Sequence, residues 1–403
     1  MRPFETFSRS EQGTIAVIFA IALVPVLGLS GAAIDYTRAT QTRGKLQAAV
    51  DAAAIGALTI KASSDSQRQA NGTAVFQSSQ PTGVTSTVTV KANAKEATVT
   101  AQSSVQTSLL KVIGIPAIDV RSFAKAARMK DGPPPCVLTL SKTASPAIDL
   151  GGSASFEGKS CVLHANSSAT GAIAVGGSAK VKADGYCAVG TVSSYYALSP
   201  APENGCAEME DPYAALAAPT STTCSPGTPN QVPSSQSKTL QPGVYCGGLT
   251  ILGNATLNPG LYVIKDGSLG MNSQGTIVAK GVTFYLMGSN AGFDIAGGAK
   301  LELSPMTDGP YRGLVIVQDR NSNVSGTSKL NGNDNTVVTG AIYAPTQLVR
   351  MNGTGTFGQT SPFMPLIADR VIITGNATAK TDATNVNLVA PLPKSLTGAR
   401  LEQ

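Results

Sequence analysis

The N-terminal part of the chain opens with an unbroken apolar run. No charged residue occurs between Glu11 and Asp35, so residues 13–34 form 22 consecutive uncharged positions, most of them Ala, Val, Ile or Leu. A helix of that length measures about 33 Å, which is enough to cross a hydrocarbon core of about 30 Å. The pattern predicts a single-pass transmembrane helix over 13–34, preceded by a tail over 1–12. A cleaved export signal is the alternative, because Ser30-Gly31-Ala32 offers a small-x-small cleavage site.

Beyond Asp35 the helical pattern continues to residue 60, as an Ala-rich extension over 35–60. Apolar side chains recur there at spacings of three and four residues, which marks one face of a helix. This stripe consists of Leu46, Ala49, Val50, Ala53 and Ala57. Small side chains allow close approach of another backbone. Two interpretations stay open: the stripe docks on the chain's own next domain, or it is a helix-packing interface with other membrane-anchored subunits.

The pattern of apolar and polar residues over 61–130 predicts a small α+β domain. Apolar and polar residues alternate in several segments, which is the period of a strand, and Asn93–Glu96 separates the first two as a hairpin turn. The predicted elements are strands at 84–90, 97–101 and 117–127 and a short helix at 108–115. Three successive prolines then make residues 131–135 a stiff linker, because proline can continue neither a helix nor a strand ladder.

Residues 136–395 carry an internal repeat. The segment "AIDLGGSA" at 147–154 returns as "AIAVGGSA" at 172–179, 25 residues later, and looser copies follow. Short apolar strands with Gly- and Asn-rich corners at a period of about 20–29 residues are typical of a stacked β-solenoid. One copy offers few inward apolar residues, so stacking has to build the core. The inward positions are Ile148, Leu150, Ile173, Val175 and Ile295.

The expected fold is therefore mainly β. It combines the N-terminal transmembrane α-helix, its helical extension beyond the membrane, the small α+β domain and a parallel, β-helix-like solenoid. Residues 193–237 are rich in Pro, Ser and Thr and interrupt the repeat, which predicts a loop insertion. Residues 396–403 are expected to form a tail.

All six cysteines lie downstream of the apolar run, and an even count in an exported region indicates disulfides. The candidates are Cys136, Cys161, Cys187, Cys206, Cys224 and Cys246. The first three open equivalent apolar segments, so stacking would bring two neighbours within disulfide range. Fifteen pairings remain possible. Metal binding is the alternative, but zinc sites need closely paired ligands and no C-x-x-C pair occurs, so we expect no metal and no other cofactor.

Composition narrows the possible partners. Charged residues make up 13% of the chain, aromatic residues 5%, and the net charge is +6 at pH 7. The Lys and Arg residues are scattered and no basic cluster with interleaved aromatics occurs, so a nucleic-acid partner is not expected.

Catalysis requires side chains that converge. Solenoid enzymes acting on carbohydrates use clustered carboxylates, but the acidic candidates occur singly, at different places in the repeat. They are Asp149, Asp184, Asp294, Asp308, Asp319 and Asp334. The "NGNDN" segment at 331–335 is interpreted as a corner turn rather than a cation site, and His164 as a packed residue. We expect no catalytic residue.

The first part of the chain resembles the N-terminal domain of TadG-like proteins of the Tad/Flp (type IVc) pilus-assembly system. The resemblance covers residues 9–58. It rests on Gly13, on Ala16 and Phe19 in the span, on Pro25 and Asp35-Tyr36, and on Leu46-Gln47-Ala48-Ala49 followed by Asp51-Ala52-Ala53. A weaker likeness to the repetitive region of short TadG-like proteins lies in "LQPGVYCGGLTI" and "NPGLYVIKDGSL". Two departures limit it. No Asp-x-Ser-x-Ser metal motif occurs, and Ile18 occupies the place of the glutamate that follows a prepilin cleavage site.

The resemblance implies a bacterial inner-membrane protein with a cytoplasmic N-terminus and a periplasmic C-terminal domain. Its expected role is a non-enzymatic component of pilus assembly whose partners are other pilus-assembly or pseudopilin subunits. The first alternative is a cell-surface adhesin that binds a glycan through the Ser/Thr/Asn face of the solenoid. The second alternative is a carbohydrate-active β-helix enzyme.

Overall fold

The computed structural model divides into two compact units, residues 1–128 with 398–403 and residues 129–397. The residues it describes are 11–80, 85–129, 132–272, 274–295, 298, 300–322, 326–331, 336–352, 356–357, 363–384, 392, 394–395 and 397–402. The first ten residues of the predicted tail lie outside this set. So do Asp334 and most of the "NGNDN" segment.

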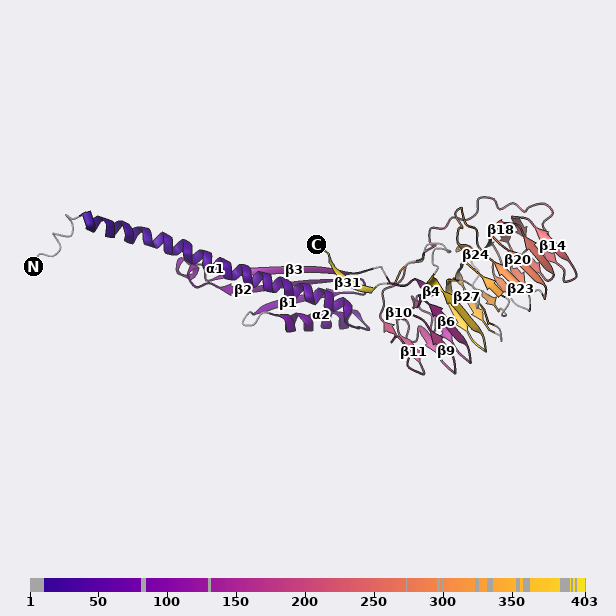
Figure 1. Cartoon of the computed structure of the whole chain (residues 1–403), viewed down its shortest axis with the longest axis horizontal. Helices are drawn as coiled ribbons and strands as arrows, with labels where there is room; N and C mark the ends of the chain where they lie inside the picture. The colour runs from indigo at the N-terminus through magenta and orange to yellow at the C-terminus, as the bar shows by residue number, and fades with distance from the viewer. Residues whose placement is uncertain are drawn as a thin grey trace, which may run out of the picture. The chain divides into compact units, whose positions relative to one another are not determined.

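The first unit packs two helices against an antiparallel sheet. Its elements are α1 (Glu11–Thr59), α2 (Asp65–Ser79), β1 (Ser86–Ala92), β2 (Glu96–Gln106), a 3₁₀ helix (Leu110–Ile113), β3 (Ala117–Met129) and β31 (Thr397–Glu402). The strand order is β1-β2-β3-β31. Figure 1 shows α1 lying along the sheet, with its N-terminal part extending beyond it. The segment expected as a C-terminal tail therefore contributes an edge strand, where Glu402 pairs with Lys125 at 2.8 Å.

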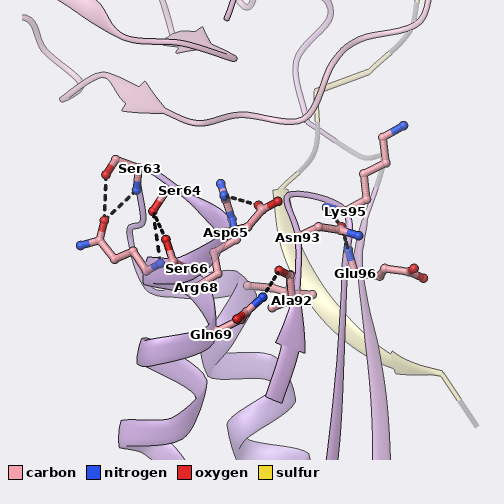
Figure 2. A network of polar contacts seen from close by, with 12 residues as sticks. Ser63, Ser64, Asp65, Ser66, Arg68, Gln69, Ala92, Asn93, Lys95 and Glu96 are labelled. Carbon is pink, nitrogen blue, oxygen red and sulfur yellow. Dashed lines mark hydrogen bonds and ion pairs between the residues drawn. The ribbon is translucent and has the colours of Figure 1, made fainter. Parts of the chain in front are cut away.

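Local side-chain bonds fix the start of α2 and its position beside the hairpin (Figure 2). The hydroxyl of Ser64 accepts from the backbone N–H of Gln67, which satisfies one of the free donors of the first turn. Gln69 of α2 donates to the carbonyl of Ala92 at the end of β1. The Asn93 side chain accepts from two backbone N–H groups that follow it and closes the β1–β2 turn. The helix and the hairpin are thus joined by hydrogen bonds as well as by packing.

Small residues let α1 and α2 pack closely. A Cβ placed on Gly72 of α2 would lie 2.9 Å from Val90 Cγ1, 3.0 Å from Ala57 Cβ and 3.3 Å from the carbonyl oxygen of Ala53. Gly72 is therefore held between the sheet and α1. Gly44, farther up α1, has no neighbour within 4 Å of such an atom. The close packing of α1, α2 and the sheet near the C-terminal end of α1 explains why small residues are needed there.

The second unit is a stack of parallel strands in three ladders. In stack order the first ladder is β12 (Glu203–Asn204), β10 (Gly185–Ala188), β7 (Val162–Ala165), β4 (Pro135–Thr139), β29 (Leu366–Ile373), β27 (Ala341–Met351), β24 (Leu314–Gln318), β21 (Val282–Met287), β18 (Gly260–Lys265) and β15 (Gly243–Cys246).

The other two ladders follow the same course. The second is β11 (Val192–Ser194), β8 (Ile173–Val175), β5 (Ile148–Leu150), β29, β27, β25 (Thr327–Leu330), β22 (Phe293–Ile295), β19 (Leu269–Met271), β16 (Leu249–Ile251) and β13 (Gln231–Val232). The third is formed by two sheets, β9 (Lys180–Lys182), β6 (Ser155–Lys159), β30 (Thr378–Asp382) and β28 (Thr356–Phe357), and β26 (Thr336–Val338), β23 (Lys300–Leu303), β20 (Thr276–Ala279), β17 (Asn254–Leu257) and β14 (Ser237–Leu240).

The interior of the stack is a continuous apolar spine. All five of the inward positions named from the sequence are at most 2% exposed, because alternate residues of each short strand point inward. Aromatic rings continue the spine near one end, where Tyr262 lies between Tyr245 and Phe284 at centroid distances of 5.7 Å. The mainly β fold with parallel sheets and an apolar N-terminal helix is confirmed. A solenoid path is the interpretation that the repeated parallel pairings favour.

The chain enters this stack in its middle. Strand β4, the first of the unit, pairs on one side with β7 and on the other with β29, more than 220 residues later in sequence. In Figure 1 β4 lies between β10 and β27. From β4 the chain builds rungs toward one end, at β12. It then restarts at the opposite end, at β15, and builds back until β29 closes on β4.

The connection between the two ends is residues 206–224, here called the strap. It lies within the predicted insertion at 193–237, whose remaining parts contain β12 and β13, most of β11 and the first residue of β14. The ten strands of the first ladder are separated by nine steps of about 4.8 Å, or about 43 Å. Eighteen residue steps reach about 60 Å when fully extended. The strap is therefore an extended crossover along the stack rather than a loop that leaves it.

Each part of the strap is bonded to a different level of the stack. Asn166, after β7, exchanges two hydrogen bonds of 2.8 and 2.9 Å with the backbone of Met209. The hydroxyl of Tyr343 in β27 donates to Asp211, 2.9 Å away, and the Tyr343 ring makes an edge contact with Tyr213. Farther along, Tyr311 donates to the Ala217 carbonyl and Lys265 to the Thr222 carbonyl. These bonds follow the order of the strands and fix the strap in register.

Candidate functional site

The N-terminal part of α1 presents apolar side chains outward. Val17, Ile18, Phe19 and Ile21 are between 56% and 69% exposed, and Leu29 is 74% exposed. Within the described residues, α1 is the one helix that is long and apolar enough to cross a membrane. The helix continues past Pro25 without a break, although proline has no N–H to donate to the preceding turn. Exposed apolar surface on this scale needs a partner, and a helix satisfies its own backbone groups inside lipid.

Asp35 lies where the apolar run ends, and its carboxylate holds the segment between β2 and β3. Oδ1 accepts from the backbone N–H of Ser108 at 3.0 Å, and Oδ2 accepts from the N–H groups of Leu109 and Leu110 at 2.8 Å each. These are donors that a helix start leaves free, and a carboxylate is the strongest acceptor for them. One turn later, Arg38 donates to the hydroxyl of Ser108.

The same segment touches α1 inside the apolar run. A Cβ on Gly31 would lie 2.6 Å from the Cβ of Leu109, so only glycine allows this approach. In the sequence, Asp35 is the residue that ends the apolar run and belongs to a family motif, but its binding of the 108–110 backbone is not predicted there. The sequence signal for this role is a carboxylate at the boundary of the predicted span. An unpaired charge there has an unfavourable free energy, so a carboxylate in this position needs hydrogen-bond donors.

The small-residue stripe lies in the core of the first unit. Leu46, Ala49, Val50, Ala53 and Ala57 are all at most 1% exposed and belong to one buried cluster with residues of α2, β2 and β3. The chain's own sheet and second helix therefore cover the stripe. This is the first of the two alternatives for it.

The cysteines form three disulfides, Cys136–Cys161, Cys187–Cys206 and Cys224–Cys246, with Cα–Cα distances of 5.2, 6.0 and 5.7 Å. The first joins adjacent strands of the stack. The other two bind one end of the strap to β10, which is the neighbour of the end strand β12, and the other end to β15 at the opposite end of the stack. Glu203 lies beside the second pair, but two bonded sulfurs are not thiolates and do not form a zinc site.

Two of the described acidic candidates lie far apart along one ladder. Asp149 in β5 and Asp294 in β22 occupy the same ladder, four strand steps or about 19 Å apart. Glycosidases hold their two carboxyl groups about 5–9.5 Å apart. Asp294 faces Lys329 at 3.6 Å, and Asp319 accepts from a backbone N–H in its own turn. Of the remaining candidates, Asp184 and Asp308 are exposed, and Asp334 lies outside the described residues.

His164 is 3% exposed in β7, and burial lowers its pKa to about 4. The neutral form is therefore the native one at pH 7. Below about pH 6.5 His164 of the unfolded chain becomes protonated, whereas His164 of the native state stays neutral down to about pH 4. The free energy of unfolding therefore decreases between about pH 6.5 and pH 4, by up to about 3 kcal/mol.

We expect His164→Gln to flatten this part of the stability curve. The measurement is the free energy of unfolding by denaturant from pH 7 to pH 4 for both proteins. Comparing slopes rather than absolute values removes any cost of the substitution itself. Parallel slopes for the two proteins would contradict the prediction.

Comparison with known proteins concerns the first unit alone. Residues 13–63 match the family described as putative Flp pilus-assembly TadE/G-like. No curated protein and no solved structure matches the chain. The matched region contains the predicted span, Asp35 and the whole stripe, and it ends directly before the residue that caps α2. The N-terminal part of the chain is therefore similar to TadE/G-like Flp pilus-assembly domains, and this similarity supports a TadG-like protein of the Tad system.

Proposed function

We propose that the chain is a non-enzymatic, membrane-anchored component of Flp pilus assembly. Its N-terminus lies in the cytoplasm, α1 crosses the inner membrane, and both folded units stand in the periplasm. The observation that carries this proposal is the coincidence of the family match with α1. The matched region includes both the exposed apolar part of the helix and the part that is packed in the first unit.

The disulfides support the proposed periplasmic location of the second unit. The two strap disulfides and the pair between adjacent strands use all six cysteines of the chain. Such bonds persist in the bacterial periplasm and are rare in the cytosol. They also brace a stack whose strands are short, which suits a body that acts as a rigid surface for protein contacts.

The packing of Gly31 against Leu109 supports retention of the anchor. A signal peptidase site at Ser30-Gly31-Ala32 would cut within α1, where Gly31 packs against Leu109. Cleavage there would remove Gly31 and its contact with Leu109, whereas Asp35 would remain in the chain. A permanent anchor agrees with this packing better than a removable signal does.

The test is complementation of a strain that lacks this chain. We expect surface pili to be lost and to be restored by the full-length protein. A control replaces residues 1–32 by a cleavable export signal, so that the folded units are exported without an anchor. We expect this control not to restore pili. Normal piliation in the strain without the chain would contradict the proposed function.

A polysaccharide adhesin is the second candidate. It is supported by a row of exposed hydroxyl and amide side chains on strands β14, β17 and β20 of the third ladder. These are Ser237, Thr239, Asn254, Thr256 and Thr276. The same strains distinguish the two functions. An adhesin deletion would leave pili on the surface and reduce attachment of the cells to glycan-coated surfaces.

A further inference from the structure

The segment between β2 and β3, residues 107–116, exposes a group of apolar side chains. Val112 is 83% exposed, Ile113 68%, Leu109 47% and Ile115 45%. They lie in and beside the 3₁₀ helix, which Gly114 ends with a positive φ of 89°. Four large apolar side chains in so short a segment are unusual for a surface loop in water, where such patches mark interaction sites.

The position of this group along α1 identifies what it contacts. Leu109 meets α1 at Gly31, and Asp35 binds the backbone of residues 108–110. Gly31 lies three residues inside the apolar run, about 4.5 Å along the helix from its end. The segment is therefore fixed at the level where the hydrocarbon core would end and the headgroups begin.

The charges of this region match a bilayer surface. Lys111 is exposed among the apolar side chains, and Arg38 binds Ser108 at 2.8 Å on the polar side. Long basic side chains at this depth extend their charged ends toward water and phosphate while their stems stay in apolar surroundings. Amphipathic segments of this composition bury their apolar side about 5–10 Å into the boundary of headgroups and acyl chains.

We propose that residues 107–116 form a second membrane contact, in which Leu109, Val112, Ile113 and Ile115 insert into the leaflet beside α1. The inference rests on the proposed anchoring of α1. The contact fixes the first unit against the membrane at a second point, so that the unit does not swing freely about the helix. The occupant of this surface is lipid, since the neighbouring part of α1 provides continuity with the span.

The chain has no tryptophan, so a single introduced tryptophan reports its own surroundings. The experiment uses the full-length protein in bilayers that contain lipids brominated near the headgroup end of the acyl chains. We expect Val112→Trp to emit at shorter wavelength than in water and to be strongly quenched by the brominated lipids. Because Val112 is 83% exposed, the substitution disturbs no packing.

Two further variants separate the possible failures. Ile60→Trp places the indole at an exposed position beyond the end of α1, about 39 Å along the helix direction from Ile34, and we expect no quenching there. Phe19→Trp, inside the apolar run, is expected to be quenched by lipids brominated deep in the chains. Quenching of Phe19→Trp without quenching of Val112→Trp would overturn the second contact alone. Absence of quenching at both would overturn the membrane anchor as well.

Discussion

Removing the two strap disulfides, Cys187–Cys206 and Cys224–Cys246, by substitution with serine is expected to destabilise the second unit by about 6 kcal/mol. The closed loops span 19 and 22 residues, and loop entropy assigns about 3 kcal/mol to each. The measurement is the free energy of unfolding of the full chain by denaturant, followed by a signal from the second unit.

Cys136–Cys161 is the matched control. It closes a loop of 25 residues, so its removal is expected to cost about 3 kcal/mol by the same entropy, but neither of its cysteines belongs to the strap. Limited proteolysis separates the two cases. Cleavage within residues 207–223 should become fast only in the strap variant. Equal protection of the strap in both variants would contradict the assignment of the strap as a disulfide-held crossover.

Gly72→Leu is expected to destabilise the first unit by about 3 kcal/mol. A side chain at Gly72 meets Val90 on one side and Ala57 and the Ala53 backbone on the other, and overpacking of a closed core costs about 1–3 kcal/mol, occasionally more. Thermal or denaturant unfolding with a signal from the first unit measures the loss.

Gly44→Leu is the control, because it makes the same change at an open position of α1. There the better helix propensity of leucine should stabilise the protein by somewhat less than 1 kcal/mol. Equal effects of the two substitutions would show that the α1–α2 packing is looser than described.

The sequence predicts local elements in this protein because their signals are local. Alternation over residues 97–101 and the Asn93 turn indicate the hairpin of β1 and β2, and spacings of three and four mark the buried stripe of α1. The inward positions of the stack, such as Ile148 and Ile173, follow from the repeat. Each depends only on the periodicity of buried side chains.

The order of the rungs could not be predicted in the same way. Every parallel strand presents an equivalent edge, so the repeat that links β5 with β8 gives no information about which strand covers the other edge of β4. The long connection was visible as a Pro- and Ser-rich segment, but its role depends on contacts of Met209, Tyr213 and Thr222 with distant strands. A single sequence does not encode these pairings in any local pattern.

Two features of the first unit depend on the same kind of long-range contact. The C-terminal residues add β31 to a sheet formed nearly 270 positions earlier. Asp35 binds backbone groups at Ser108–Leu110, more than 70 residues later. The charge of Asp35 was visible in the sequence, but its acceptor role required the position of the loop.

The central claim is that α1 is a permanent membrane anchor whose folded units stand in an oxidising compartment. Alkaline extraction of native membranes, followed by peptide mapping without reduction, tests both parts on the same sample. We expect the intact chain to stay with the lipid and to yield crosslinks for Cys136–Cys161, Cys187–Cys206 and Cys224–Cys246. Recovery of the chain in the soluble fraction with unmodified thiols would contradict the claim.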